Sequence, residues 1–175
     1  MPVAVIMQRR VLQNRWQSEA WEPFGVLANH VEADAQASTP RLIVQEDALA
    51  QWLHPGFELK LFRDETEGYY LNVSSNVPRV FVMWRMEDER AVPQFVTLSY
   101  NEAGRLMDGG EQVDTVPMPP EVMAWVGSYV EANYKPEPKR RSRPQSFMKP
   151  GDRGKAPDNV TVGDFGRGRP AKKAS

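Results

Sequence analysis

The fold is decided by residues 57–98, FELKLFRDETEGYYLNVSSNVPRVFVMWRMEDERAVPQFVTL. Apolar and polar residues alternate through most of this stretch, and a period of two is typical of β-strands that bury one face. The alternation falls into three blocks, which are separated by charged or proline-containing breaks. We therefore expect an antiparallel meander in the middle of the chain.

The first block predicts a β-hairpin. Phe57, Leu59 and Leu61 share one face of an extended chain. Residues 64–68 have the composition of a turn, and the alternation resumes over residues 69–73. Two more strands are expected after this hairpin, over Val80–Arg85 and Phe95–Leu98, with the charged residues 87–90 between them.

The N-terminal part of the chain also favours short strands separated by turns. The expected elements are a strand over Val3–Val11, a second strand or an irregular packed segment over Phe24–Val31, a loop over Glu32–Pro40, a strand over Arg41–Gln45 and one helical turn over Asp47–Leu53.

Two helices are expected after the meander. Ser99 and Glu102 have the spacing of a capping box, and Gly109-Gly110 can end that helix with a left-handed residue. A second helix that runs to about Tyr134 is expected after Pro117-Met118-Pro119-Pro120, because proline is tolerated in a first helical turn. Its apolar stripe consists of Val122, Val126, Tyr129 and Val130. The predicted fold class is α+β: a mainly antiparallel β-sheet or partly open barrel, with the two C-terminal helices packed on it.

Charge divides the chain into a body, residues 1–134, and a tail, residues 135–175. The whole chain has a net charge of −1, but its charges are unevenly distributed. The tail contains 12 basic and 4 acidic residues and has a net charge of +8, so the body has a net charge of −9. The tail is rich in proline and glycine and has few large apolar side chains, so we expect it to be disordered in isolation. A basic tail on an acidic body indicates a separate partner for the tail, although it could also lie on its own body.

Two clusters in the tail are candidates for binding that partner. Residues 139–147 could contact an acidic protein or phosphates, and the sequence Gly-Arg-Gly-Arg-Pro at 166–170 resembles the AT-hook that places arginines in a narrow minor groove. Nucleic-acid binding through the tail is therefore an alternative function, and it predicts an affinity that falls steeply with salt. The candidate partner-binding residues are Lys139, Arg140, Arg141, Arg143, Phe147, Arg167, Arg169, Lys172 and Lys173.

Catalytic chemistry finds little support in the sequence. The absence of cysteine excludes disulfides, thiolate metal sites and cysteine nucleophiles. His30 and His54 lack the spacing of metal ligands, and His54-Pro55-Gly56 is typical of a turn. The acidic clusters at 64–67 and 87–89 fit solvated turns better than acid–base pairs, which need burial to shift their pKa values. We expect no catalytic residue, metal or cofactor, although a small enzyme with an unfamiliar carboxylate site stays open.

The five tryptophans could stack on bases or anchor partners. Core packing is the simpler expectation, because aromatic side chains are commonly buried. These residues are Trp16, Trp21, Trp52, Trp84 and Trp125. The sequence also lacks a signal peptide and any apolar run of the roughly 20 residues that a membrane-spanning helix needs, so a cytoplasmic protein is expected.

Residues from about Val3 to Phe147 resemble a bacterial family of uncharacterised proteins, DUF3305. The resemblance rests on motifs spread along this range. They are Trp16 and Trp21, Pro55–Leu59, Tyr69–Val73, Pro78 with Phe81–Arg85, Ser99–Ala103, Asp114–Pro119 with Trp125, and Arg143–Phe147.

The resemblance implies a role rather than a reaction. Genes of this family commonly lie beside those for molybdenum-dependent formate dehydrogenase and its maturation factors. The implied function is a non-catalytic accessory protein or small subunit that assists assembly, maturation or stabilisation of that enzyme through protein–protein contacts. Formate dehydrogenase or a maturation factor is then the expected partner, and gene neighbourhood is the only ground for it.

Overall fold

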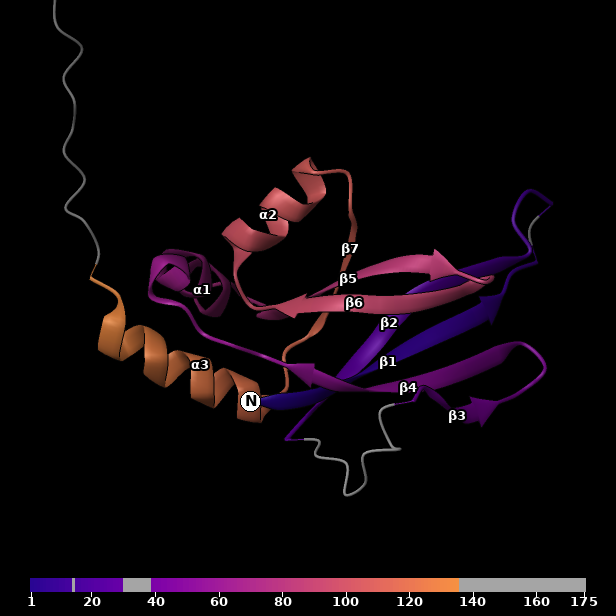
Figure 1. Cartoon of the computed structure of the whole chain (residues 1–175), viewed down its shortest axis with the longest axis horizontal. Helices are drawn as coiled ribbons and strands as arrows, with labels where there is room; N and C mark the ends of the chain where they lie inside the picture. Colours follow the sequence, from indigo (N-terminus) through magenta and orange to yellow (C-terminus); the bar gives the residue numbers. More distant parts are fainter. Residues whose placement is uncertain (14, 30–38, 136–175) are drawn as a thin grey trace, which may run out of the picture. The chain divides into compact units, whose positions relative to one another are not determined.

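The computed structural model describes residues 1–13, 15–29 and 39–135, and it contains seven strands and three α-helices in this part of the chain (Figure 1). The strands are β1 (Pro2–Val11), β2 (Glu19–Ala28), β3 (Arg41–Gln45), β4 (Leu49–Glu58), β5 (Arg79–Glu87), β6 (Arg90–Thr97) and β7 (Gln112–Pro117). The helices are α1 (Thr66–Val73), α2 (Tyr100–Asp108) and α3 (Pro120–Asn133), and one turn of 3₁₀ helix over Arg63–Glu65 precedes α1. These elements belong to one unit that spans Met1–Pro136.

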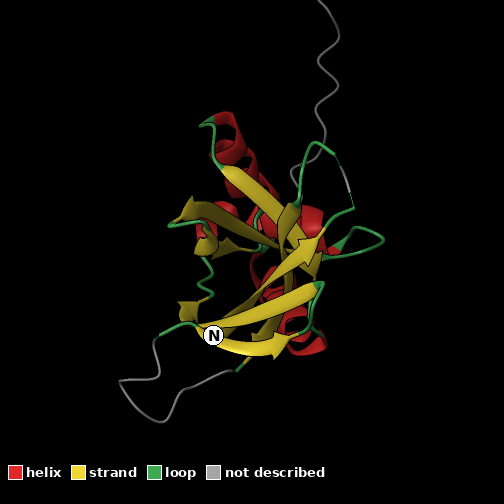
Figure 2. Cartoon of the chain, turned by 90° about the vertical axis from the view of Figure 1, so that its right-hand side faces the viewer, coloured by secondary structure: helices red, strands yellow, loops and turns green. Residues whose placement is uncertain are grey.

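The strands form two antiparallel sheets. One has the order β2-β1-β4-β3 and the other the order β6-β5-β7. Figure 2 shows the strands of the two sheets crossing one another instead of closing into a continuous barrel. The expectation of a mainly antiparallel α+β fold is therefore confirmed in its coarse form, and a closed barrel is absent from the described residues.

The core starts from one face of β1. Val3, Val5 and Met7 alternate along this strand and are fully buried, as the period of two requires. β1 pairs with β2 on one side and with β4 on the other, so its inner face lies at the centre of the larger sheet. The core cluster adds residues of the second sheet and of the helices: Val80, Val82, Trp84, Val116, Leu59, Tyr69, Val122, Val126 and Val130.

The predicted hairpin over residues 57–73 is wrong, because β4 ends at Glu58 and the expected second strand forms α1. The buried residues Glu65, Tyr69 and Asn72 recur at helical spacing, whereas Leu71 of the expected strand face is exposed. The Asn72 side chain explains why a helix forms here. It donates to the carbonyls of Arg79 (2.7 Å) and Leu98 (2.8 Å), and it accepts from the Arg79 amide (2.9 Å). Leu98 is 26 residues away in sequence, and the alternating pattern of residues 69–73 reveals neither partner.

The predicted helical turn over Asp47–Leu53 is also wrong. β4 begins at Leu49 and stays extended, because it pairs with β1 on one side and with β3 on the other. The strand predicted over Arg41–Gln45 is confirmed at both ends as β3. The loop predicted over Glu32–Pro40 lies mostly outside the described residues.

The helix signals locate α2 and α3 well. Ser99 caps α2 and accepts from the Glu102 amide at 3.2 Å, while the Glu102 carboxylate accepts from Thr97 Oγ1 instead of reaching back to the cap. α2 ends at Asp108 with Gly109 as its C-cap, Gly110 follows with φ of 85°, and α3 starts at Pro120. The expected set of two helices is nevertheless incomplete, because α1 precedes them and β7 separates α2 from α3.

Gly68 allows α1 to approach the start of α2. A Cβ atom at this position would lie 2.1 Å from Ser99 Oγ and 3.1 Å from Ser99 Cβ. The Ser99 side chain cannot easily move away from such an atom, since its hydroxyl also donates to the buried Glu65 carboxylate. The close approach of the two helices therefore requires glycine.

We predict that Gly68→Ala lowers the free energy of unfolding by about 1–3 kcal/mol through overpacking. Urea denaturation measures the change. Gly127→Ala in α3 is the matched control, because no atom lies within 4 Å of its added Cβ, and helix propensity should make it stabilising by about 0.5–1 kcal/mol. Equal effects of the two substitutions would contradict the packing of α1 against Ser99.

Candidate functional site

The inner face of β1 continues beyond the core. Residues 3, 5, 7 and 9 point the same way, so Arg9 follows Met7 on this face. The register pairs Arg9 with Trp21 of β2, and it pairs Met7 with Trp52 of β4. Two tryptophans and an arginine therefore lie on one face of the large sheet. The helices gather at the opposite end of the strands from the β5–β6 turn (Figure 1).

The tip of the β5–β6 hairpin forms the facing wall. Glu87 pairs with Arg90, which leaves Asp88 and Glu89 as a two-residue turn. Both turn residues have positive φ, 46° and 64°, the combination that a type I′ turn requires and that Asn-Gly normally supplies. Left-handed backbone at non-glycine residues costs about 1–2 kcal/mol per residue. Such strain clusters at functional sites, and here the strained turn places Asp88 and Arg90 beside the tryptophans.

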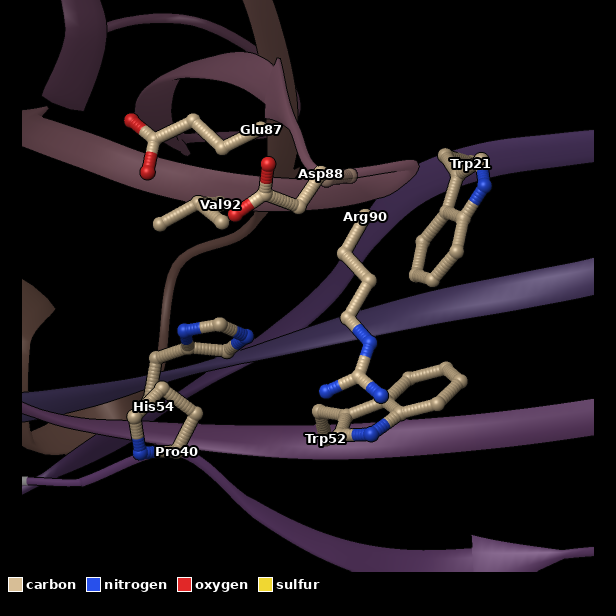
Figure 3. Close-up of a pocket in the computed structure, with 9 residues that line it drawn as sticks. Trp21, Pro40, Trp52, His54, Glu87, Asp88, Arg90 and Val92 are labelled. Carbon is tan, nitrogen blue, oxygen red and sulfur yellow. The ribbon is translucent and has the colours of Figure 1, made fainter.

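These walls enclose a cavity of about 340 Å³ (Figure 3). Two further hollows adjoin it, and all three share Trp52 and Arg90 as walls. We call this continuous site the indole groove. It is defined by Arg9, Trp21, Trp52, His54, Asp88 and Arg90.

The two indoles lie against each other, with ring centroids 5.1 Å apart and planes tilted by 34°. The Arg9 guanidinium carbon lies 5.9 Å from the centroid of the Trp52 ring, within the range of a cation–π contact. Arg9 Nη1 donates to Glu19 at 3.3 Å, whereas its buried Nε has no hydrogen-bond partner among the described residues. Buried donors without a partner are rare, and this one lowers stability because neither solvent nor a ligand reaches it.

His54 is a strand residue of the groove and not the turn residue that its Pro-Gly neighbours predict. It pairs with Val5 of β1 and is only 7% exposed. Burial disfavours the charged imidazolium and lowers the pKa of His54 from 6.5 to about 4. The ring is therefore neutral at pH 7 and offers one donor and one acceptor.

The depressed pKa of His54 makes a prediction for stability. The unfolded chain binds a proton near pH 6.5 and the folded chain only near pH 4, so folding loses stability as the pH falls between these values. We expect this residue to account for about 2–3 kcal/mol of that loss. Urea denaturation of the wild type and of His54→Gln at pH 7.5, 5.5 and 4 measures it, and parallel curves for the two proteins would contradict the burial of a neutral imidazole.

The expectation of core packing for all five tryptophans is only partly correct. Trp84 is 3% exposed and donates from Nε1 to Asp114 at 2.7 Å, and Trp21 and Trp125 pack against the core. Trp16 is 91% exposed, whereas Trp52 lines the groove together with the other side of Trp21. The sequence signal for the groove is therefore the arginine that continues the alternating face of β1, together with the two tryptophans that the register brings beside it.

The two acidic clusters have different surroundings. Asp88 and Glu89 form an exposed turn, as expected, although they also border the groove. Glu65 does not lie in a solvated turn as predicted: it is buried, and it accepts from the Ser99 hydroxyl and from Arg105. Its two carboxylate oxygens are thus engaged in holding α2 against the turn that precedes α1.

The partner-binding residues predicted in the tail lie outside the described residues. This applies to Lys139, Arg140, Arg141, Arg143, Phe147, Arg167, Arg169, Lys172 and Lys173. Nucleic-acid binding through the tail, and tail disorder, stay predictions. In the part of the chain that is described, no three His, Asp or Glu side chains are placed to hold a metal ion, and no helix is long and apolar enough to cross a membrane.

Comparison with known proteins gives one match. The model of a family described as "Protein of unknown function (DUF3305)" matches residues 2–143. No curated protein and no solved structure matches the chain.

Proposed function

The chain belongs to the DUF3305 family, and we propose that it is a non-catalytic accessory protein that binds a larger protein through the indole groove. The observation that carries this proposal is the pairing of Trp21 and Trp52 beside two arginines in an open cavity. Tryptophan and arginine are the residue types that most often dominate the binding energy of protein interfaces. A groove of this size accepts one segment of a partner.

The chemistry of the groove favours binding over turnover. Nucleophilic or acid–base catalysis needs a reactive group with its partner in hydrogen-bond reach and a pKa suited to the task. The groove contains exposed carboxylates of the hairpin tip beside an imidazole that stays neutral at pH 7, but no hydrogen bond joins the imidazole to a carboxylate among the described residues. The side chains that meet over Trp52 are instead indoles and guanidiniums (Figure 3). These groups stack and donate hydrogen bonds, which are the contacts of a recognition site.

For the partner we propose a molybdenum-dependent formate dehydrogenase or one of its maturation factors. The support is the gene neighbourhood that the family resemblance implies, and the role would be in assembly, maturation or stabilisation of the enzyme in the cytoplasm. Such a role needs a surface that binds the partner and no catalysed reaction, and the groove can provide that surface. The basic tail would contribute a second, electrostatic contact to the same partner.

Affinity purification tests this proposal directly. The tagged full-length protein is expressed in bacterial cells that produce formate dehydrogenase, and co-purified proteins are quantified by mass spectrometry. We expect the dehydrogenase or a cofactor-insertion protein to be recovered with the wild type, and recovery to fall at least tenfold for Trp52→Ala because the groove loses its central indole.

Trp16→Ala is the matched control, since it removes the same side chain from a position that is 91% exposed and does not line the groove. Its recovery should equal that of the wild type. Circular dichroism and thermal unfolding establish that both variants are folded. The proposal fails if neither protein class is recovered, or if Trp52→Ala recovers as much partner as Trp16→Ala.

A further inference from the structure

Carboxylates outnumber guanidiniums around the indole groove. Glu19, Glu87, Asp88 and Glu89 line its hollows together with Arg9 and Arg90, which leaves two negative charges in excess. Glu19 is paired with Arg9 at 3.3 Å, so the excess resides on the hairpin tip. His54 adds no charge at pH 7, because burial lowers its pKa to about 4. A ligand with a basic group is therefore favoured at this rim.

Arg90 supplies hydrogen-bond donors above the indoles. Its guanidinium has no ion pair among the described residues and points toward Trp52 (Figure 3). A segment of backbone that presents carbonyl acceptors but few N–H donors is the complement of this guanidinium, and proline supplies a carbonyl without an N–H.

The indoles supply the matching apolar surface. Trp21 and Trp52 are tilted by 34° and form a wedge-shaped floor, and Pro40 extends the apolar wall on one side. Proline-rich segments in the polyproline II conformation dock on aromatic-lined grooves, because their rings are apolar and their backbone is already ordered before binding.

We propose that the indole groove binds an extended segment of the partner in which prolines lie next to a lysine or arginine. This inference rests on the proposed function, since it takes the groove as the docking site. The proline rings contact Trp21 and Trp52, and the backbone carbonyls accept from Arg90. The basic side chain pairs with Asp88 or Glu89 on the strained turn.

Three synthetic peptides test this assignment on the full-length chain. The first is acetyl-Leu-Pro-Pro-Leu-Pro-Pro-Arg-Arg-amide, the second replaces its prolines by alanine, and the third replaces its arginines by glutamate. Labelling the tryptophans with ¹⁵N gives one indole N–H signal for each of the five residues, which single substitutions assign. Titration then reports binding at each indole separately.

We expect the first peptide to shift the signals of Trp21 and Trp52 and to leave that of the buried Trp84 unchanged. The alanine and glutamate peptides should bind at least tenfold more weakly. Trp52→Ala should abolish the response at Trp21, whereas Trp16→Ala should not change the affinity. The double variant Asp88→Asn/Glu89→Gln keeps the indoles and should weaken binding of the first peptide by about three- to tenfold, because it removes two exposed carboxylates.

The inference is overturned if the first peptide shifts neither groove signal at millimolar concentration. Equal binding of the alanine peptide also overturns it, because prolines are then not recognised. Equal binding of the glutamate peptide overturns it as well, because the basic side chain is then not recognised. The unchanged Trp84 signal verifies the fold of each variant. If the formate dehydrogenase partner is still recovered in a Trp52-dependent manner while no peptide binds, the proposed function stands and only the proline assignment fails.

Discussion

β1 is the element on which the rest of the structure depends. It pairs on both sides, with β2 and with β4, and it places one alternating face at the centre of the larger sheet. Val3, Val5 and Met7 on this face are fully buried. Arg9 follows at the same period but lies where the core has ended, so a single strand supplies both the core and the floor of the groove. The groove thus lies on the same face of β1 as the core, beyond the last buried core residue of that strand.

The groove stays open because its facing wall is a hairpin tip and not a packed strand. The turn at Asp88 and Glu89 holds two non-glycine residues in left-handed backbone, which lowers stability but places carboxylates and Arg90 over the indoles. The helices stabilise the opposite end through buried polar contacts of Asn72 and Glu65. One end of the unit is thereby well packed and the other presents unpaired donors and aromatic surface.

Much of the fold follows from local patterns in the sequence. Alternation locates β1 and β3, and the Ser99 cap and Pro120 locate the starts of α2 and α3. The alternating residues 69–73 mislead, because Asn72 donates to the Leu98 carbonyl and Gly68 lies against Ser99, and both contacts join residues that are distant in sequence. Local propensity is outweighed there by tertiary contacts.

The groove is less predictable than the fold for the same reason. Local sequence predicts a different role for each of its residues. A tryptophan indicates core packing, His54 beside Pro-Gly indicates a turn, and residues 87–89 indicate a solvated loop. Their meeting depends on the register of β1 with two strands and on the crossing of a second sheet. The sequence alone shows one unusual feature of the groove, which is Arg9 at the end of an otherwise apolar alternating face of β1.

The central claim is that the inner face of β1 changes from core to binding groove between Met7 and Arg9. Urea denaturation of Met7→Ala and Arg9→Ala at pH 7 tests it most directly. Removing the buried Met7 side chain should cost about 2–5 kcal/mol of unfolding free energy. Removing Arg9, whose partly exposed ion pair adds little, should cost less than about 1 kcal/mol. A loss for Arg9→Ala as large as that for Met7→Ala would show that Arg9 belongs to the core and would contradict the account.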